Sequence, residues 1–246
     1  MPEKQTNVGG LRAVELSFRP MRDIASGRSI CYLSRTQLNT PLLGTLMPST
    51  FRPVAESNEL SDKLFPLELL QLAESVRRLN EAGRPFNWLS MDLPMTILRD
   101  RATSSVADKI CEQFSLTSNE FCFCIPEQVL FENDGVCADN VARYRRRGYH
   151  IILTGFGENG CPYIKLSELA VDYVMLSPSV TSFVGKNEKT DQAVHSIVDF
   201  INNLGIEPIA DGVKNSIQAE SFYEFGCNFC VGPLSGDYIS LDELIE

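Results

Sequence analysis

Short apolar runs alternate with longer segments of helical periodicity along most of the chain. The runs are rich in β-branched, aromatic and Cys side chains, which is typical of buried strands. Eight strands are predicted, at 14–20, 29–35, 86–93, 120–126, 150–156, 172–177, 207–213 and 227–232. Helices are predicted between them at 64–82, 103–114, 134–147, 163–170, 190–204 and 215–225.

Eight strands with interleaved helices in 246 residues predict an α/β fold, a TIM-like (β/α)8 barrel. The first two strands have no clear helix between them, and Ser26-Gly27-Arg28 resembles a hairpin turn, so one early strand is expected to be antiparallel. The segment 36–63 is rich in Pro, Ser and Asn and is expected to form a lobe over the barrel mouth. No linker divides the chain, which predicts a flexible N-terminus at 1–13 and one barrel domain at 14–246.

Composition and charge limit the partners and the cellular location that we expect for this domain. The net charge is −10, which argues against direct nucleic-acid binding. No apolar run approaches the roughly 20 residues of a membrane span, and the polar beginning does not resemble a signal peptide. Several of the eight Cys lie in strand-like runs, where a free thiol acts as a small hydrophobe. We expect a reducing, cytoplasmic location.

The stretch 155–160 spells G-x-G-x-x-G and suggests a dinucleotide-binding turn. A Rossmann turn belongs to the first βαβ unit, with an acid ending the next strand. Here the motif follows the fifth predicted strand, Asp172 begins the next one, and Pro162 follows closely. We therefore predict no dinucleotide cofactor, and no other cofactor is predicted.

In a barrel the chemistry lies where the strands end, at the C-terminal face. The side chains predicted there are Cys31, Asp92, Cys124, Thr154, Gly155, Met175, Asp211 and Val231. His150 precedes a strand and His195 lies within a helix, so no catalytic triad is predicted.

A series of motifs, in the correct order and spacing, resembles those of the EAL domain, the family of bacterial cyclic di-GMP phosphodiesterases. The opening FRPMRDIASGRSICYLSR is similar to Q-P-I-x-D…T-G…E-A-L-x-R, and MPSTFRPVAE to P-x-x-F-I-P-x-A-E. LSMDLP stands at V-N-L-S and FCIPE at L-E-I-T-E. The block from Thr154 to Asp172 matches D-D-F-G-T-G to V-D, ADGVKNSIQ matches A-E-G-V-E-T-x-x-Q, and FGCNFCVG matches L-G-C-D-x-x-Q-G.

The resemblance implies an enzyme that cleaves a phosphodiester with two divalent cations. At the matching positions, however, the family's metal-binding and catalytic residues are replaced, by Cys31, Asp92, Cys124, Thr154, Gly155, Met175, Ser177, Asp211 and Val231. Of the positions that hold oxygen ligands for the metals in the family, only Asp92 and Asp211 could still serve. Met175 replaces the catalytic lysine. The sequence therefore predicts a degenerate domain that is not an enzyme and has no catalytic residue.

Three functions are then open. The first is a bacterial regulatory protein in cyclic di-GMP-related signalling that acts through contacts with an unidentified protein partner. Because this chain is acidic, a partner with a basic face would be favoured. The resemblance also leaves a homodimer open, through Tyr163, Leu166 and Ala170 in the segment 161–170.

The second function is a receptor that binds cyclic di-GMP without cleaving it. Its ligand-binding residues would be Arg19, Arg35, Phe51, Pro53, Glu56, Asp92, Glu127 and Asp211. The third is a metal site formed by Cys31, Asp92, Cys124 and Asp211, although acidic neighbours discourage thiolate formation.

Overall fold

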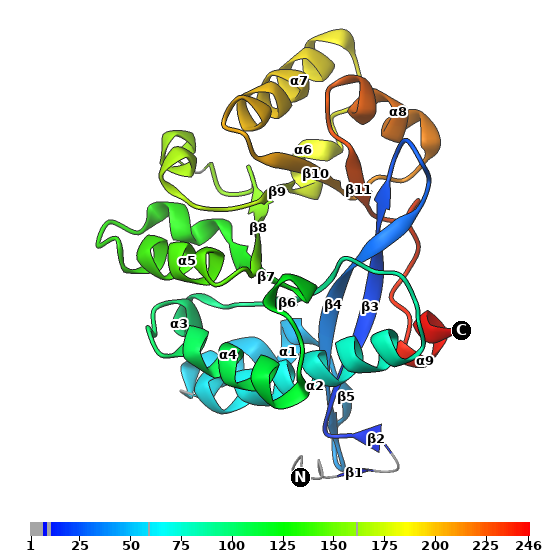
Figure 1. The fold of residues 1–246 in the computed structure, drawn as a ribbon. Helices are drawn as coiled ribbons and strands as arrows, with labels where there is room; N and C mark the ends of the chain where they lie inside the picture. Colours follow the sequence, from blue (N-terminus) through cyan, green and yellow to red (C-terminus); the bar gives the residue numbers. More distant parts are fainter. Residues whose placement is uncertain (1–6, 9–10, 59, 161) are drawn as a thin grey trace.

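Eight strands close into a barrel in the computed structural model, which describes residues 7–8, 11–58, 60–160 and 162–246 (Figure 1). Their order around the barrel is β3, β11, β10, β9, β8, β7, β6 and β4, and a β3–β4 pairing closes the ring. The strands are β3 (Val14–Asp23), β4 (Ser29–Thr40), β6 (Trp88–Asp92), β7 (Phe121–Pro126), β8 (His150–Phe156), β9 (Tyr173–Leu176), β10 (Glu207–Asp211) and β11 (Phe229–Val231). The predicted TIM-like barrel is confirmed.

Strand β3 runs antiparallel to both of its neighbours, β4 and β11, whereas the other barrel strands pair in parallel. A tight turn at residues 24–28 is sufficient here, because antiparallel strands need no crossover helix. Gly27 in this turn has φ +71°, a left-handed conformation that favours glycine. The expected early antiparallel strand is confirmed.

Helices surround the strands on the outside of the barrel (Figure 1). The long ones are α2 (Ser61–Glu81), α4 (Thr103–Phe114), α5 (Val136–Arg146), α7 (Glu188–Asn203) and α8 (Ser216–Glu224), each close to its predicted range. Short ones are α3 (Met95–Leu98), α6 (Pro178–Thr181), α9 (Leu241–Ile245), η1 (Ser118–Glu120) and η2 (Glu127–Phe131). The predicted helix at 163–170 is the 3₁₀ helix η3 (Tyr163–Glu168), since short helical segments often adopt this tighter form.

The predicted lobe contains β5 (Gly44–Leu46), which extends β4 as an antiparallel edge strand, and the helix α1 (Pro48–Ser57). Helix α1 was not predicted, because Pro53 in its middle favours a helix end. Burial of Phe51 against the domain overrides that local preference.

Most of the predicted flexible N-terminus, residues 1–13, lies outside the described residues. Two short strands in it, β1 (Asn7–Val8) and β2 (Leu11–Arg12), pair antiparallel, and Arg12 pairs with Glu74 of α2 at 2.6 Å. Within the described part of the chain, no helix combines the length and the apolar character needed to cross a membrane.

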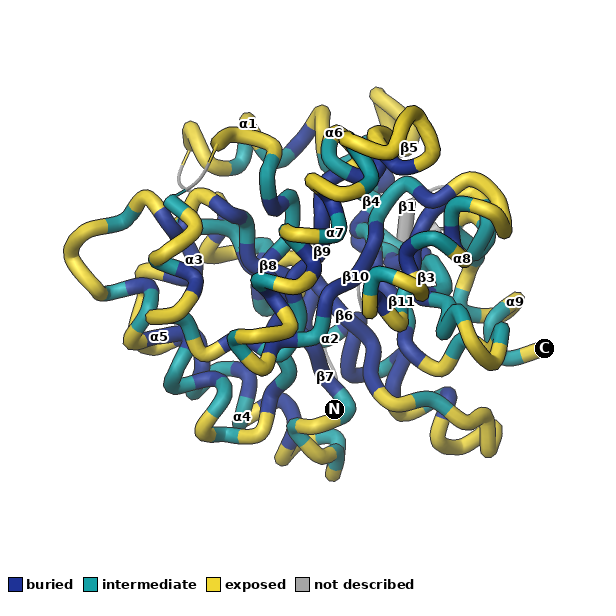
Figure 2. Tube along the Cα trace, turned by 90° about the horizontal axis from the view of Figure 1, so that it is seen from above, coloured by how far each residue is buried: buried dark blue, intermediate teal, exposed yellow. Residues whose placement is uncertain are grey.

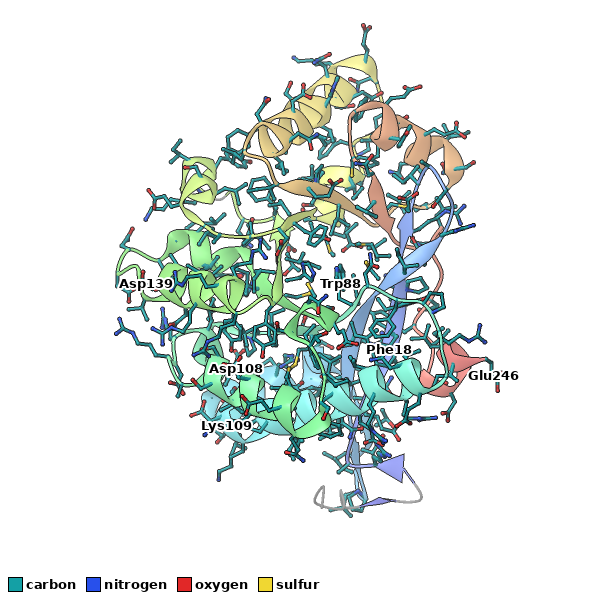
Figure 3. All side chains as sticks on the ribbon, viewed as in Figure 1. Phe18, Trp88, Asp108, Lys109, Asp139 and Glu246 are labelled. Atoms are coloured by element: carbon teal, nitrogen blue, oxygen red, sulfur yellow. The ribbon has the colours of Figure 1, made fainter. Side chains whose placement is uncertain are left out.

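The strands separate two apolar clusters, and burial is concentrated at the centre of the molecule (Figure 2). On β7, Phe121 and Phe123 pack toward the outer helices, whereas Cys122 and Cys124 belong to the cluster inside the barrel. This alternation follows from the two-residue period of a strand. Trp88 lies within the ring of strands (Figure 3) and is 1% exposed.

Candidate functional site

The carboxyl ends of the parallel strands open at one end of the barrel, which we call the barrel mouth. A pocket of about 520 Å³ lies there, between helix α1 and the ends of β6, β7 and β8. It is lined by Arg52, Glu56, Asp92, Leu93, Pro94, Met95, Thr96, Cys124, Pro126, Gln128 and Thr154. The lobe, which was expected to lie over the barrel mouth, forms one wall of this pocket.

Arg52 connects the lobe to the barrel through two carboxylates. Its Nη2 donates to Glu68 Oε1 at 2.9 Å and to Asp92 Oδ2 at 3.4 Å. Glu68 is 1% exposed, and Thr36 also donates to it. Burial raises the pKa of Glu68, and the charge of Arg52 opposes this shift. Arg52 is therefore needed to compensate a carboxylate within the protein.

Arg35, in the middle of strand β4, has a different environment. Its Cζ lies 3.8 Å from the centre of the Tyr238 ring, and Arg19 Cζ lies 5.6 Å from the same ring. Neither arginine makes an ion pair with any residue that the structure describes. The Nε of Arg35 is buried and has no hydrogen-bond partner. Two cations with unused donors thus share one aromatic ring beside the mouth.

Asp92 and Asp211 end their strands, as predicted. Burial raises the pKa of both, while Arg52 opposes the shift at Asp92 and Arg19 opposes it at Asp211. Of the Asp92 side chain, 49% is open to solvent at the mouth. Each carboxylate has an arginine as its neighbouring cation.

The donor set at the mouth does not fit two divalent cations. Such ions need several oxygen ligands each, and the described residues contain no group of three or more His, Cys, Asp and Glu side chains placed to hold a metal ion.

The alternative metal site of Cys31, Asp92, Cys124 and Asp211 is not formed either. Cys31 and Cys124 are 3% and 6% exposed and pack in the cluster inside the barrel, together with Met175 and Val231. Burial raises the pKa of each thiol to about 12, so both stay protonated near neutral pH. Apolar packing inside the barrel accounts for these positions.

Glu127 holds the glycine loop in place. It is 1% exposed, and its two oxygens accept hydrogen bonds from the backbone amides of Gly157 (2.9 Å) and Asn159 (2.6 Å) and from the Asn159 side chain (2.8 Å). The sequence analysis placed Glu127 among the ligand-binding residues, but its carboxylate is occupied by this loop. The G-x-G-x-x-G segment thus runs from the end of strand β8 into a loop that a buried acid fixes.

The remaining predicted residues of the lobe divide into two groups. Phe51 is 5% exposed and packs in the interior, so it offers no face to a ligand. Pro53 and Glu56 are exposed, and Glu56 lines the pocket.

Sequence reasoning did not single out Arg52 and Tyr238. Arg52 stands where the resembling motif P-x-x-F-I-P has an apolar residue, and this was the available signal. Tyr238 gave no such signal, because its role depends on contacts with residues far along the chain.

Residues 9–238 match the EAL domain family. Among curated relatives, the cyclic di-GMP phosphodiesterase RocR of Pseudomonas aeruginosa is 27% identical over 220 residues, which are 89% of this chain and 56% of that protein. The chain thus spans little more than half the length of that relative.

Solved structures share the fold. The EAL enzyme Bd1971, in its cAMP and cyclic-di-GMP bound form, superposes with a TM-score of 0.87 at 17% identity, over 95% of this chain and 64% of that one. The PaMucR phosphodiesterase in complex with c-di-GMP gives 0.84 at 18% identity, over 94% of both chains.

These relatives correct one prediction. The chain was predicted not to be an enzyme, and the finding that several of its curated relatives are named cyclic di-GMP phosphodiesterases overturns that prediction. The degenerate character of the domain, inferred from the strand-end residues, stays a prediction.

Proposed function

Because the chain belongs to the EAL domain family, we propose that it acts in cyclic di-GMP signalling and binds this nucleotide at its barrel mouth. The observation that supports this most directly is the arginine pair at the mouth. Neither Arg19 nor Arg35 makes an ion pair with a described carboxylate, although Asp211 lies within electrostatic reach of Arg19, and Arg35 has a buried, unused Nε donor.

The chemistry of the ligand matches these groups. A cyclic dinucleotide carries two phosphodiester anions, and a guanidinium binds a phosphate through paired N–H donors. In a protein of net charge −10, two neighbouring arginines without an ion pair provide local positive charge for an anion. The adjoining pocket of about 520 Å³, with Arg52 on its wall, offers room for a base or sugar.

Calorimetry with cyclic di-GMP tests this proposal. We expect saturable binding by the wild-type chain and a loss of affinity on the order of tenfold or more in Arg35→Ala, which removes a charged hydrogen-bond donor. Arg77→Ala is the matched control, because Arg77 pairs with Glu81 on the exposed face of α2. Absence of heat up to high micromolar nucleotide would overturn the proposal. Chromatography of the same samples, with Mg²⁺ or Mn²⁺ added, measures hydrolysis separately.

A second candidate function is regulation through contact with a protein partner. It is favoured by Leu42 and Leu43 at the tip of the β4–β5 hairpin, which are 94% and 72% exposed. A basic partner suits the net charge of −10. If this tip is used, replacing both leucines by serine should abolish co-purification of a partner, whereas Ile217→Ser, 75% exposed on α8, should not. Equal recovery with both variants would exclude the hairpin tip.

The homodimer expected through the segment 161–170 stays a prediction, with one correction. Residue 161 lies outside the described residues. Leu166 is fully buried within the domain, so it is not available to a second copy. Tyr163 (43% exposed) and Ala170 remain accessible, and so does Ile164, which is 74% exposed.

A further inference from the structure

The Arg35 side chain contacts an aromatic ring and makes no ion pair with a described acidic residue. Its guanidinium carbon lies 3.8 Å from the centre of the Tyr238 ring, which is close contact for a cation above a π face. No described residue pairs with its charge, and its Nε has no acceptor. The stacking contact with Tyr238 is therefore the interaction that the structure shows for this guanidinium.

The backbone that carries Tyr238 is fixed on both sides. Ile239, the next residue, exchanges two backbone hydrogen bonds with Phe18 of β3, at 2.7 and 2.9 Å. On the other side, the carbonyl of Gly236 accepts a hydrogen bond from Arg19 Nε at 3.0 Å. The ring is thus presented to the mouth by a segment paired with the barrel wall.

Helix α9, which follows this segment, is also fixed to the barrel. Its first turn has a capping box between Ser240 and Glu243. Arg78 of α2 pairs with Asp242 at 2.6 Å, and Arg84 donates to the carbonyl of Ile245. The chain beyond Tyr238 therefore adds rigidity to the ring's support.

We propose that Tyr238 is a positioning residue, which holds Arg35 ready to bind a phosphodiester of the nucleotide. This inference rests on the proposed function. A stacked guanidinium uses its face for the ring, and its N–H donors in the plane stay available for the two oxygens of a phosphate. Because the side chain is already ordered, less conformational freedom is lost when the ligand binds.

The same ring extends this effect to Arg19, at 5.6 Å from its centre. Arg19 uses its Nε for the Gly236 carbonyl, which leaves its terminal nitrogens for a ligand. One tyrosine thus organises two cations that come from two neighbouring antiparallel strands, β3 and β4.

Calorimetry of the full chain with cyclic di-GMP tests this role through substitutions of Tyr238. Tyr238→Phe keeps the ring and should bind within about twofold of wild type, whereas Tyr238→Leu keeps apolar volume without a π face and should bind on the order of tenfold more weakly. Thermal unfolding of the same variants identifies any that are not folded, and Tyr238→Ala serves as a second ring-less variant.

A double-mutant cycle separates positioning from a merely structural role. If Tyr238 acts through Arg35, Tyr238→Leu should cause a clearly smaller loss of affinity in an Arg35→Ala background, where only its contact with Arg19 remains. An unchanged affinity in Tyr238→Leu, or an equal loss with and without Arg35, would overturn the positioning role and leave the proposed function intact. Absence of binding by the wild type would instead overturn both.

Discussion

Arg52 of helix α1 lies 2.9 Å from Glu68 of helix α2, and this pair fixes the lobe to the barrel. The two side chains are 17% and 2% exposed, and Arg52 also reaches Asp92 at 3.4 Å. One guanidinium therefore links the lobe, the outer helical layer and the end of a barrel strand.

Loss of Arg52 should be strongly destabilising. Arg52→Ala leaves the carboxylate of Glu68 buried without its cation, and we expect the free energy of unfolding to fall by about 3–5 kcal/mol. Denaturant titration measures this. Arg77→Ala breaks an exposed pair with Glu81 and should cost less than about 1 kcal/mol. Adding Glu68→Gln to Arg52→Ala should restore part of the loss, and no restoration would argue against an uncompensated charge as the cause.

The glycine loop should depend on Glu127. In Glu127→Ala, the amides of Gly157 and Asn159 lose their acceptor, and each bond to a charged group contributes about 1.5–3 kcal/mol. Hydrogen exchange in the peptide that spans 155–160 should accelerate at least tenfold. Glu132→Ala, which removes a surface partner of Arg99, is the control and should leave that exchange unchanged. Equal exchange in both variants would contradict the assignment.

Two glycines of this loop should respond differently to a methyl group. Gly157 has φ +89°, and an added Cβ would lie 2.6 Å from Val180 Cγ2, whereas Gly160 has φ +65° and nothing within 4 Å. Gly160→Ala should lower the free energy of unfolding by about 1–2 kcal/mol from backbone strain alone. Gly157→Ala should lower it clearly more, because the contact with Val180 is added to the strain. Val180→Ala in the Gly157→Ala background should recover part of the difference in the melting temperature. Identical costs at both positions would exclude the steric contact.

Alkaline pH should destabilise the fold through its buried thiols. Burial raises the pKa of Cys31 and Cys124 to about 12, whereas an unfolded thiol ionises near 8.5. The unfolded state therefore loses protons first, so this stability is fully present below about pH 8.5 and is lost as the pH rises toward 12. At pH 9.5 the two thiols together should cost about 2–3 kcal/mol relative to pH 7.

The matched test for the thiols is Cys31→Ala combined with Cys124→Ala. Between pH 7 and pH 9.5, the free energy of unfolding should fall less in this variant than in the wild type. The difference between the two losses should be about 2–3 kcal/mol. Denaturant titrations at the two pH values give this comparison. If the free energy of unfolding falls equally in the two proteins between these pH values, groups other than the two thiols cause the loss of stability at alkaline pH.

The barrel was predictable because each strand is indicated by the pattern of side chains within one short run of the sequence. The run at 120–126 contains residues that alternate between the outer helices and the barrel interior, and the strand β7 at Phe121–Pro126 follows that pattern. The long helices were predictable for the same reason. Helix α1 was not, since the local preference of Pro53 opposes it and the burial of Phe51 decides.

The candidate site was predictable only in part. Asp92 and Asp211 were found because strand ends meet at the mouth of any such barrel. Glu127 and Phe51 were placed at the ligand, yet the first holds a loop and the second is buried in the domain. The contacts of Arg52 with Glu68 and of Arg35 with Tyr238 depend on side-chain packing between distant segments, which no periodicity in the sequence encodes.

The pairing of β3 with β11 joins the beginning and the end of the barrel sequence. The ring of strands therefore closes only when nearly the whole chain is available, and a shortened chain would present β3 and β10 as open edges that favour aggregation. Closure between such distant segments also implies slow folding, because the loop entropy must be lost before the final contacts form. Synthesis of the last strand thus sets the earliest moment at which this protein can reach its native state.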